Sequence, residues 1–214
     1  MSVFNYFKNK KIQKKFTDIF YNNSFIGSDS ISGPGSDLTQ TEIIRNEIPK
    51  LFEKFRIKSF IDAPCGDLHW MQHVKLDGIS YIGIDIVKEL IIINTKKFDN
   101  STRKFSCKNI ITDKLPNADL VLIRDCWVHL SSKDVFSCIN NLKRNNIRYL
   151  LTTSFTNLTS NSELKNIWRP LNLELAPFNF HNPIVIMNEN CTEDGGIYSD
   201  KSLLMWEISK LPSY

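Results

Sequence analysis

The feature that most constrains the fold is a regular alternation of apolar runs and helical patterns from residue 58 onward. The apolar runs are the expected strands, at 58–63, 78–86, 104–110, 118–126 and 147–155. Helical patterns lie between them at 87–98 and 131–145, and the second opens with the capping pair Ser131 and Asp134. Nearly continuous apolar strands separated by helices predict a parallel sheet that helices cover on both faces.

The end of the chain breaks this alternation. Residues 182–190 and 202–211 are two further expected strands, joined by the turn-forming stretch EDGGIYSD at 193–200. Two such neighbouring strands pair as an antiparallel hairpin. We therefore expect one α/β domain whose sheet is mostly parallel, with an antiparallel strand at its C-terminal end.

The first 57 residues follow a different pattern. Apolar residues recur at near-helical spacing over 1–20 with lysines between them. Such a basic helix lies on a membrane, meets an acidic partner, or packs on its own domain, and we favour the last. A Ser/Gly/Pro loop at 28–40 and an amphipathic helix at 41–55 follow, with Pro49 predicted to kink or break that helix. We expect residues 1–57 to form a cap or lid on a core of residues 58–214.

Composition and charge exclude several classes of function. A net charge of +4 is too small to indicate nucleic-acid binding. No apolar run approaches the roughly 20 residues of a membrane span, and the N-terminus lacks the apolar core of a signal peptide. The five cysteines are scattered and form no C-x-x-C pair, which argues for a reducing compartment. We therefore expect a cytoplasmic protein with no stable membrane anchor and no nucleic-acid partner.

Polar side chains stand at the carboxyl ends of the first four expected strands. They are Asp62, Asp85, Asn109 and the group Arg124, Asp125 and Cys126. Open parallel sheets bind ligands outside these strand ends, where the strand order reverses. Asp85 lies about 20 residues after the turn at Gly66, where nucleotide-binding sheets place a carboxylate on the two ribose hydroxyls.

The turn after the first strand narrows the kind of ligand. A dinucleotide needs the glycine pattern G-x-G-x-x-G, whereas this turn contains only Gly66. Asp62 at the strand end would also repel a phosphate. A carboxylate suits a cationic or amine-bearing ligand, and S-adenosylmethionine has an adenosine diol, a sulfonium, an amino group and no phosphate.

These segments resemble a known family. Residues 59–209 resemble the class I S-adenosylmethionine-dependent methyltransferases, because FIDAPCGD is similar to their glycine-rich first motif and YIGIDI to their second-strand acidic motif. KNIITDKLPNADLVLIRDCWVHLS is similar to their third and fourth strand segments, and the closing hairpin to their reversed last strand. The resemblance implies a Rossmann-like methyltransferase sheet. More narrowly, SGPGSDLTQT, DAPCGDLHWM, IRDCWVHL and WRPLNL resemble small bacterial members that we associate with surface-polysaccharide modification.

The resemblance also implies which residues bind the cofactor. They are Asp62, Pro64, Cys65, Gly66, Asp67, Trp70, Asp85, Ile86, Asn109, Ile110, Arg124, Asp125 and Cys126. The first five would line the methionine and ribose portion, Asp85 would hold the ribose, and the last three would border the methyl group. Trp70 either covers the cofactor or belongs to the core. Pro64 and Leu68 replace two family glycines, and Asn109 stands where many members have an acidic residue.

Methyl transfer requires orientation, exclusion of water and, for a hydroxyl acceptor, a base. His129 follows the fourth strand and titrates near neutrality, so it is either that base or a brace for the loop. Asp125, beside the expected methyl position, is the second candidate catalytic residue.

The residues expected to contact the acceptor are Ser32, Gly35, Ser36, Arg124 and Arg169. A guanidinium either binds the oxygens of an anionic or polyhydroxyl acceptor or serves as an ion-pair partner. Residues 32–36 could fold over the acceptor as a lid. We expect no metal, because Cys65, His69 and His73 lack a fourth ligand.

We therefore predict an S-adenosylmethionine-dependent methyltransferase. Its expected acceptor is a small polar molecule, either a sugar or a phosphorylated precursor of a surface polysaccharide. A nucleotide-linked oxidoreductase is the first alternative, which the missing glycines disfavour. A non-catalytic module that binds a cofactor or a partner is the second.

Overall fold

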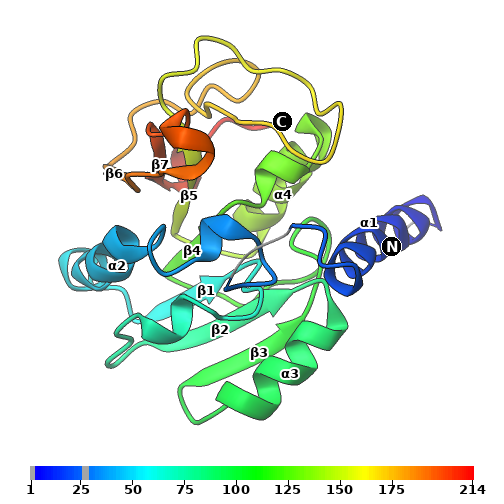
Figure 1. The fold of residues 1–214 in the computed structure, drawn as a ribbon, viewed down its shortest axis with the longest axis vertical. Coiled ribbons are helices and arrows are strands. Elements are labelled where there is room, and N and C mark those ends of the chain that lie inside the picture. Colours follow the sequence, from blue (N-terminus) through cyan, green and yellow to red (C-terminus); the bar gives the residue numbers. More distant parts are fainter. Residues whose placement is uncertain (1–2, 26–28) are drawn as a thin grey trace.

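The computed structural model describes residues 3–25 and 29–214, with side chains described from Lys10 onward. Its centre is a seven-stranded sheet with the strand order β3-β2-β1-β4-β5-β7-β6 (Figure 1). The strands are β1 (Ser59–Asp62), β2 (Ser80–Asp85), β3 (Arg103–Cys107), β4 (Leu120–Ile123), β5 (Tyr149–Phe155), β6 (Val185–Asn188) and β7 (Lys201–Glu207). Each predicted strand segment overlaps one of them, and β3 and β7 each begin one residue before the predicted segment, so these predictions are confirmed.

The pairing of the strands also follows the prediction. β1 pairs in parallel with β2 and β4, and the parallel pairs β2–β3 and β4–β5 extend the sheet on both sides. β7 runs antiparallel to both β5 and β6. The sheet is therefore mostly parallel with one reversed strand, and its order reverses between β1 and β4.

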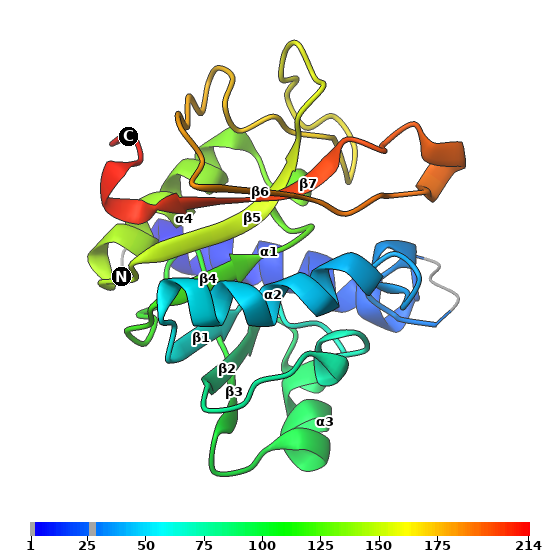
Figure 2. The ribbon, with the colours of Figure 1, turned by 90° about the vertical axis from the view of Figure 1, so that its left-hand side faces the viewer.

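Helices cover both faces of the sheet because the strands are apolar on both faces. β4 and β5 are buried along their whole length. α2 (Glu42–Phe55) packs Ile48 on one face, and α4 (Ser132–Arg144) packs Ile139 on the other. α3 (Lys88–Phe98) contacts β2 and β3 at one end of the sheet. Figure 2 shows the sheet between α2 in front and α1 behind.

Two details of the helices bear on the predictions. The hydroxyl of Ser131 accepts a hydrogen bond from the backbone N–H of Asp134 at 3.2 Å, which confirms the predicted cap of α4. α2 runs through Pro49 without a break, so the break allowed for there is wrong. Proline in a helix interior costs about 3 kcal/mol. Burial of a large apolar side chain contributes about 1.5–3 kcal/mol, so Ile48 and Phe52 together offset that cost.

α1 (Val3–Tyr21) contacts its own domain on the face that α4 covers. Ile12 and Phe16 pack against the hydrophobic core of that face. The Nζ atom of Lys15 donates a hydrogen bond to the backbone oxygen of His129 at 3.3 Å. Among the residues that the structure describes, no helix combines the length and the hydropathy needed to cross a membrane.

Candidate active site

A cavity of about 170 Å³ lies at the carboxyl ends of β1, β2 and β4, where the strand order reverses. This is the position at which open parallel sheets bind their ligands. Every residue predicted to bind the cofactor lines this cavity, from Asp62 to Cys126. Ser32, Ser36 and His129 line it as well, whereas Gly35 and Arg169 are not among its lining residues.

Two buried carboxylates stand at its floor. The side chain of Asp85 accepts hydrogen bonds from the backbone N–H groups of Gly66, at 3.1 Å, and Val87, at 2.9 Å. Asp62 accepts a hydrogen bond from the hydroxyl of Tyr81 at 2.9 Å. Burial raises the pKa of Asp85 to about 6 and that of Asp62 to about 7, although these hydrogen bonds act in the opposite direction. A ligand that stabilises the ionised carboxylates would therefore lower the pKa of both groups.

The turn after β1 requires glycine at one position. Gly66 has a φ of +54°, and a Cβ atom there would lie 2.3 Å from the hydroxyl oxygen of Ser32. The Nδ2 atom of Asn94 donates to the carbonyl of Gly66 at 2.7 Å. Leu68, which replaces a family glycine, also has a left-handed φ of 59°. The backbone thus keeps a glycine-like shape at Leu68 although the residue is different.

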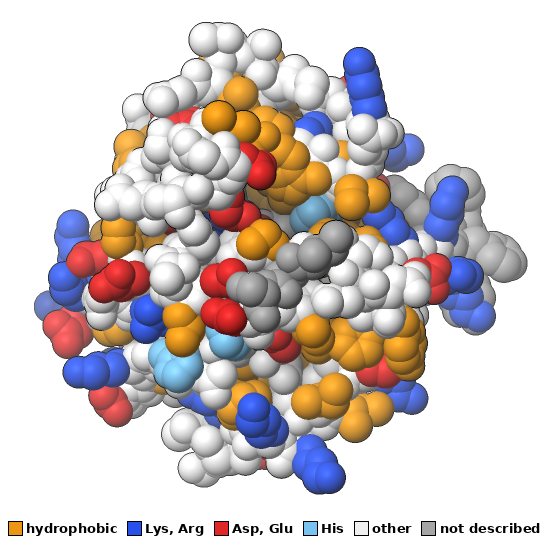
Figure 3. Space-filling model, viewed as in Figure 1, with side chains coloured by type: hydrophobic (Ala, Val, Ile, Leu, Met, Phe, Trp, Pro, Cys, Tyr) orange, Lys and Arg blue, Asp and Glu red, His pale blue; other side chains and the backbone are white. Residues whose placement is uncertain are grey.

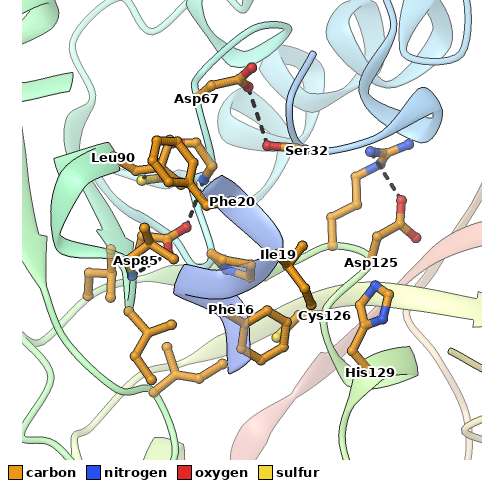
Figure 4. Close-up of a pocket in the computed structure, with 18 of the residues that line it drawn as sticks. Phe16, Ile19, Phe20, Ser32, Asp67, Asp85, Leu90, Asp125, Cys126 and His129 are labelled. Atoms are coloured by element: carbon orange, nitrogen blue, oxygen red, sulfur yellow. Dashed lines mark hydrogen bonds and ion pairs between the residues drawn. The ribbon is translucent and has the colours of Figure 1, made fainter. Parts of the chain in front are cut away.

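Asp67 holds a loop against this turn. Its carboxylate accepts hydrogen bonds from the hydroxyl of Ser30 at 2.9 Å and the backbone N–H of Ile31 at 3.1 Å. A longer contact of 3.4 Å joins it to the hydroxyl of Ser32 (Figure 4). The carboxylate is therefore used mainly to fix the serine-rich loop beside the cavity, a role that the sequence did not indicate.

Another part of the cavity is lined by apolar side chains. Ile86 and Ile110 line it as predicted, and Val87, Leu90 and Ile111 are lining residues that the sequence analysis missed. The side-chain oxygen of Asn109 accepts a hydrogen bond from the backbone N–H of Ile111 at 2.9 Å.

The N-terminal helix forms another wall of the cavity. Ile12, Phe16, Ile19 and Phe20 of α1 line it. Figure 4 shows Phe16, Ile19 and Phe20 projecting from this helix among the residues that line the cavity. The sequence analysis recognised the apolar face of this helix but did not place it over the strand ends. An apolar wall of this kind keeps water away from the strand ends.

His129 lines the cavity with one nitrogen already engaged. Its Nδ1 atom lies 2.5 Å from the backbone oxygen of Ile167. Because a carbonyl oxygen only accepts, Nδ1 carries the proton and Nε2 keeps its lone pair in the neutral ring. Burial lowers the pKa of His129, against the raising effects of the Ile167 carbonyl and Asp125. The ring is therefore neutral at physiological pH and braced at the same time.

Arg124 is part of a buried ion-pair network rather than a free cation. Its guanidinium contacts a carboxylate oxygen of Glu189 at 2.6 Å, the backbone oxygen of Gly35 at 2.7 Å and Asp125 at 3.3 Å. It also lies 5.5 Å from the ring centroid of Trp70. Arg124 is therefore an ion-pair partner, as one of the two alternatives has it, and its contact with an acceptor stays a prediction.

Asp125 is paired with two buried cations, Lys201 and Arg124. It contacts Nζ of Lys201 at 2.7 Å. Burial acts to raise its pKa, but Lys201 and Arg124 hold that pKa at about 2. Asp125 is therefore ionised at physiological pH, where it orients charge and does not accept a proton. The catalytic role expected for Asp125 stays a prediction.

The buried residues Glu189 and Lys201 were missed by the sequence analysis. Glu189 follows the last residue of β6, and Lys201 is the first residue of the reversed strand β7. Both therefore reach the edge of the sheet that carries Asp62 and Asp85. The sequence analysis considered the carboxyl ends of the first four expected strands only. It would have needed to include the end of β6 and the start of the reversed strand β7.

Arg169 requires a correction. Its guanidinium is buried and donates to the backbone oxygens of Leu130, at 2.6 Å, and Ser162, at 2.7 Å. It therefore connects the end of the β4–α4 loop to the segment after β5, and it is not among the lining residues of the cavity. Among the described residues, no group of three or more His, Cys, Asp or Glu side chains is arranged to hold a metal ion.

No family model matches the chain, and no curated protein matches it in sequence. Solved structures do match. The 1,6-didemethyltoxoflavin-N1-methyltransferase of Burkholderia thailandensis, with bound 1,6-didemethyltoxoflavin and S-adenosylhomocysteine, aligns with a TM-score of 0.62 at 11% identity over 97% of this chain and 90% of that one. The magnesium protoporphyrin IX methyltransferase of Synechocystis PCC 6803, with bound S-adenosylmethionine, gives 0.59 at 11% identity over 93% and 96%.

The fold is that of the S-adenosylmethionine-dependent methyltransferases. Human N-acetylserotonin methyltransferase in complex with S-adenosylmethionine aligns with a TM-score of 0.56 at 10% identity over 77% of this chain, which spans only 51% of that protein. At such low identity these similarities establish the fold alone. The methyltransferase fold predicted from the sequence is confirmed, while the narrower surface-polysaccharide resemblance has no counterpart among these structures.

Proposed function

We propose that this protein is an S-adenosylmethionine-dependent methyltransferase that acts on a small polar acceptor. The observation that carries the proposal is the position of Asp85 in the cavity, at the carboxyl end of β2 and beside the Gly66 turn. A carboxylate there suits a ribose diol, and the apolar end of the cavity suits an adenine. The turn after β1 has only Gly66 in place of the pattern G-x-G-x-x-G, which argues against the oxidoreductase.

The residues that would hold the cofactor follow from this arrangement. Asp85 would accept both ribose hydroxyls through the lone pairs that its backbone contacts leave open. Ile86 and Ile110 would flank the adenine, and Asp62 would lie near the positively charged methionine portion. When bound, S-adenosylmethionine supplies an electrophilic methyl carbon on a sulfonium. The protein's part is to orient this carbon and exclude water.

His129 would act as the base for a hydroxyl acceptor. Its Nε2 atom keeps a lone pair in the neutral ring and would take the proton of the acceptor hydroxyl. The contact of Nδ1 with Ile167 would hold the ring in place during this transfer. Base and brace, which the sequence analysis left open, are then two roles of one side chain.

The N-terminal region would serve as the cap or lid. Its helix contributes an apolar wall, and its serine-rich loop is held beside the Gly66 turn by Asp67. We place the active protein in the cytoplasm, with no nucleic-acid partner.

For the acceptor, we propose a hydroxyl group of a small molecule such as a sugar of a surface-polysaccharide precursor. The resemblance of segments such as IRDCWVHL and WRPLNL to polysaccharide-modifying methyltransferases supports this choice. A phosphorylated sugar is disfavoured, because Arg124 and Lys201 are already paired with carboxylates.

Isothermal titration calorimetry tests the cofactor. We expect saturable binding of S-adenosylmethionine and S-adenosylhomocysteine, and no heat with NAD⁺ or NADP⁺. The matched control for the variant Asp85→Ala is Asp77→Ala. It removes an exposed carboxylate from the turn before β2 and should leave the binding unchanged. Binding of NAD⁺ without binding of S-adenosylhomocysteine would refute the proposal.

A further inference from the structure

A second cavity, of about 230 Å³, lies beside the first. The two cavities share four lining residues, namely Phe25, Ser32, Asp125 and His129. In the proposed mechanism His129 is the base, so a molecule in the second cavity would lie next to the group that takes its proton. No residue of its own far wall was predicted to have a function.

Three aromatic rings gather on that far wall. Trp168 and Tyr198 lie edge to face with ring centroids 5.1 Å apart. Phe155 is 5.9 Å from Trp168 and 5.6 Å from Tyr198, again edge to face. The rings come from the end of β5, the segment after it and the loop before β7, so three distant parts of the chain build one wall. Trp168 and Tyr198 are only half-buried, which leaves apolar ring surface open to a ligand.

Carboxylates dominate the charges around this cavity. Glu193 and Asp125 line it together with Lys201, whose Nζ atom lies 2.7 Å from Asp125 and 3.6 Å from Glu193. Glu189 lies 3.8 Å from Nζ of Lys201 and forms an ion pair with the guanidinium of Arg124. The two cations are thus shared among three carboxylates, and the balance is negative.

Two further observations agree with a negative field. Asp194 also lines the cavity, and burial together with the carboxylates of Asp194 and Glu193 raises the pKa of Tyr198. Figure 3 shows acidic and hydrophobic side chains side by side on this face of the molecule, while most of the visible lysines and arginines lie toward its rim.

The loop of residues 32–36 contributes to the walls of both cavities and lies against the same charged side chains. A Cβ atom on Gly35 would lie 3.1 Å from a carboxylate oxygen of Glu193 and 3.3 Å from both Asp125 and Lys201. The carbonyl of Gly35 accepts a hydrogen bond from Arg124. Gly35, predicted to contact the acceptor, therefore lets the loop close over the ion-pair network. This closure fixes the boundary of the second cavity.

We propose that the second cavity binds the methyl acceptor, and that this acceptor is a hydroxyl-bearing ring compound without negative charge. The inference rests on the proposed methyltransferase function and specifies its substrate class. Aromatic rings stack on sugar or aromatic rings and attract cations. Carboxylates accept hydrogen bonds from hydroxyl and ammonium groups and repel phosphates and carboxylates.

Ligand-observed NMR in the presence of saturating S-adenosylhomocysteine tests the charge preference. The probes are two matched pairs: methyl α-glucoside with glucose 6-phosphate, and tyramine with 4-hydroxyphenylacetate. We expect the glucoside or tyramine to bind at least about tenfold more tightly than its anionic counterpart. Preference for the anionic member of either pair, or failure of both the glucoside and tyramine to bind, overturns the inference.

Variants tie the binding to this cavity. Trp168→Ala should weaken the probe that binds by about tenfold through loss of a stacking surface. The control Ile197→Ala changes a side chain that is 68% exposed in the same loop as Tyr198 and should bind like the wild type. Equal effects of the two substitutions would contradict the assignment.

The cofactor titration separates the two proposals. If S-adenosylhomocysteine does not bind the wild-type protein, the proposed function itself fails. If it binds with equal affinity to the wild type and Trp168→Ala while no uncharged or cationic probe binds, only the acceptor assignment fails.

Discussion

The Nδ1 atom of His129 lies 2.5 Å from the backbone oxygen of Ile167. This contact assigns the ring proton to Nδ1 and leaves Nε2 as the basic nitrogen on a residue that lines both cavities. A single hydrogen bond thus combines bracing with readiness to accept a proton.

His129→Ala should lower kcat for a hydroxyl acceptor by about 10²–10⁴ and leave the affinity for S-adenosylhomocysteine unchanged. His129→Asn is the informative companion, because its amide N–H can replace Nδ1–H toward Ile167 but has no basic nitrogen. The Asn variant should therefore melt near the wild-type temperature and be as slow as the Ala variant. Near-normal turnover in His129→Asn would leave bracing as the only role of His129.

The pH profile provides a second readout of His129. Burial lowers its pKa below the usual 6.5, so the base stays neutral until the solution is more acidic than for an exposed histidine. kcat/KM should fall only as the pH drops through that lowered pKa, when imidazolium can no longer accept a proton. A profile that is flat down to pH values where the protein unfolds would contradict general-base catalysis.

Asp85→Ala should weaken S-adenosylhomocysteine binding by at least about tenfold, because each charge-assisted hydrogen bond to the ribose contributes about 1.5–3 kcal/mol. Calorimetry measures the change, and circular dichroism checks that the variant is folded. Unchanged affinity in folded Asp85→Ala, beside the unchanged Asp77→Ala control, would rule out the ribose assignment.

The affinity for S-adenosylhomocysteine should also depend on pH through the same carboxylate. Ribose hydroxyls donate to the ionised form, and the pKa of Asp85 is raised to about 6. Binding should therefore weaken by up to about tenfold per pH unit below pH 6 and level off above it. Asp85→Asn should lose this dependence, and its persistence in that variant would assign the titration to another group.

Stability of the ligand-free protein should have the opposite dependence on pH. The pKa of Asp62 is about 7 in the folded state, and its unfolded value is near 4, so the folded chain binds more protons between these values. The contribution of Asp62 to the free energy of unfolding should therefore fall by at most about 1.4 kcal/mol per pH unit as the pH rises from 4 to 7. Urea denaturation of Asp62→Asn, which still accepts the Tyr81 hydrogen bond, should show a shallower fall. Equal slopes for the two proteins would mean that Asp62 is not the group responsible.

Part of the site could be predicted from the sequence by one rule, namely that parallel sheets bind ligands at the carboxyl ends of their strands. Asp62, Asp85 and Asn109 follow apolar runs, so their place at one edge of the sheet follows from parallel pairing alone. The rule was not carried to the reversed strand β7, which brings Lys201 to the same edge as the end of β6. Arg169 lies in a long irregular segment, where no periodicity indicates which way a side chain points. Its role therefore required the structure.

Arg124→Met illustrates what the structure changes. The sequence suggested a loss of acceptor binding, whereas the buried pair with Glu189 now predicts a loss of stability. Removing one partner of a buried pair costs about 3–5 kcal/mol, because the other charge is left uncompensated. The double variant Arg124→Met/Glu189→Leu should recover part of this cost in urea denaturation. No recovery would show that the two side chains are not energetically coupled.

The N-terminal helix should act as a wall of the cofactor cavity rather than as a membrane anchor. Ile12, Phe16, Ile19 and Phe20 all face that cavity, so the described apolar face is already used within the domain. Deleting residues 1–20 should lower the melting temperature and weaken S-adenosylhomocysteine binding, because one wall is removed. A control with Lys11→Glu and Lys14→Glu changes only exposed charges and should keep the wild-type values.

Flotation with anionic vesicles decides between this role and membrane binding. A helix whose apolar face is buried has little apolar surface left for lipid, so the intact protein and the deletion variant should both stay in the unbound fraction. The lysine variant should behave in the same way, since lysines alone add only about 1 kcal/mol each at an anionic surface. Strong flotation of the intact chain that disappears in both the deletion and the lysine variant would reverse the assignment, because it would require the helix to leave the cavity and insert its aromatic residues into lipid.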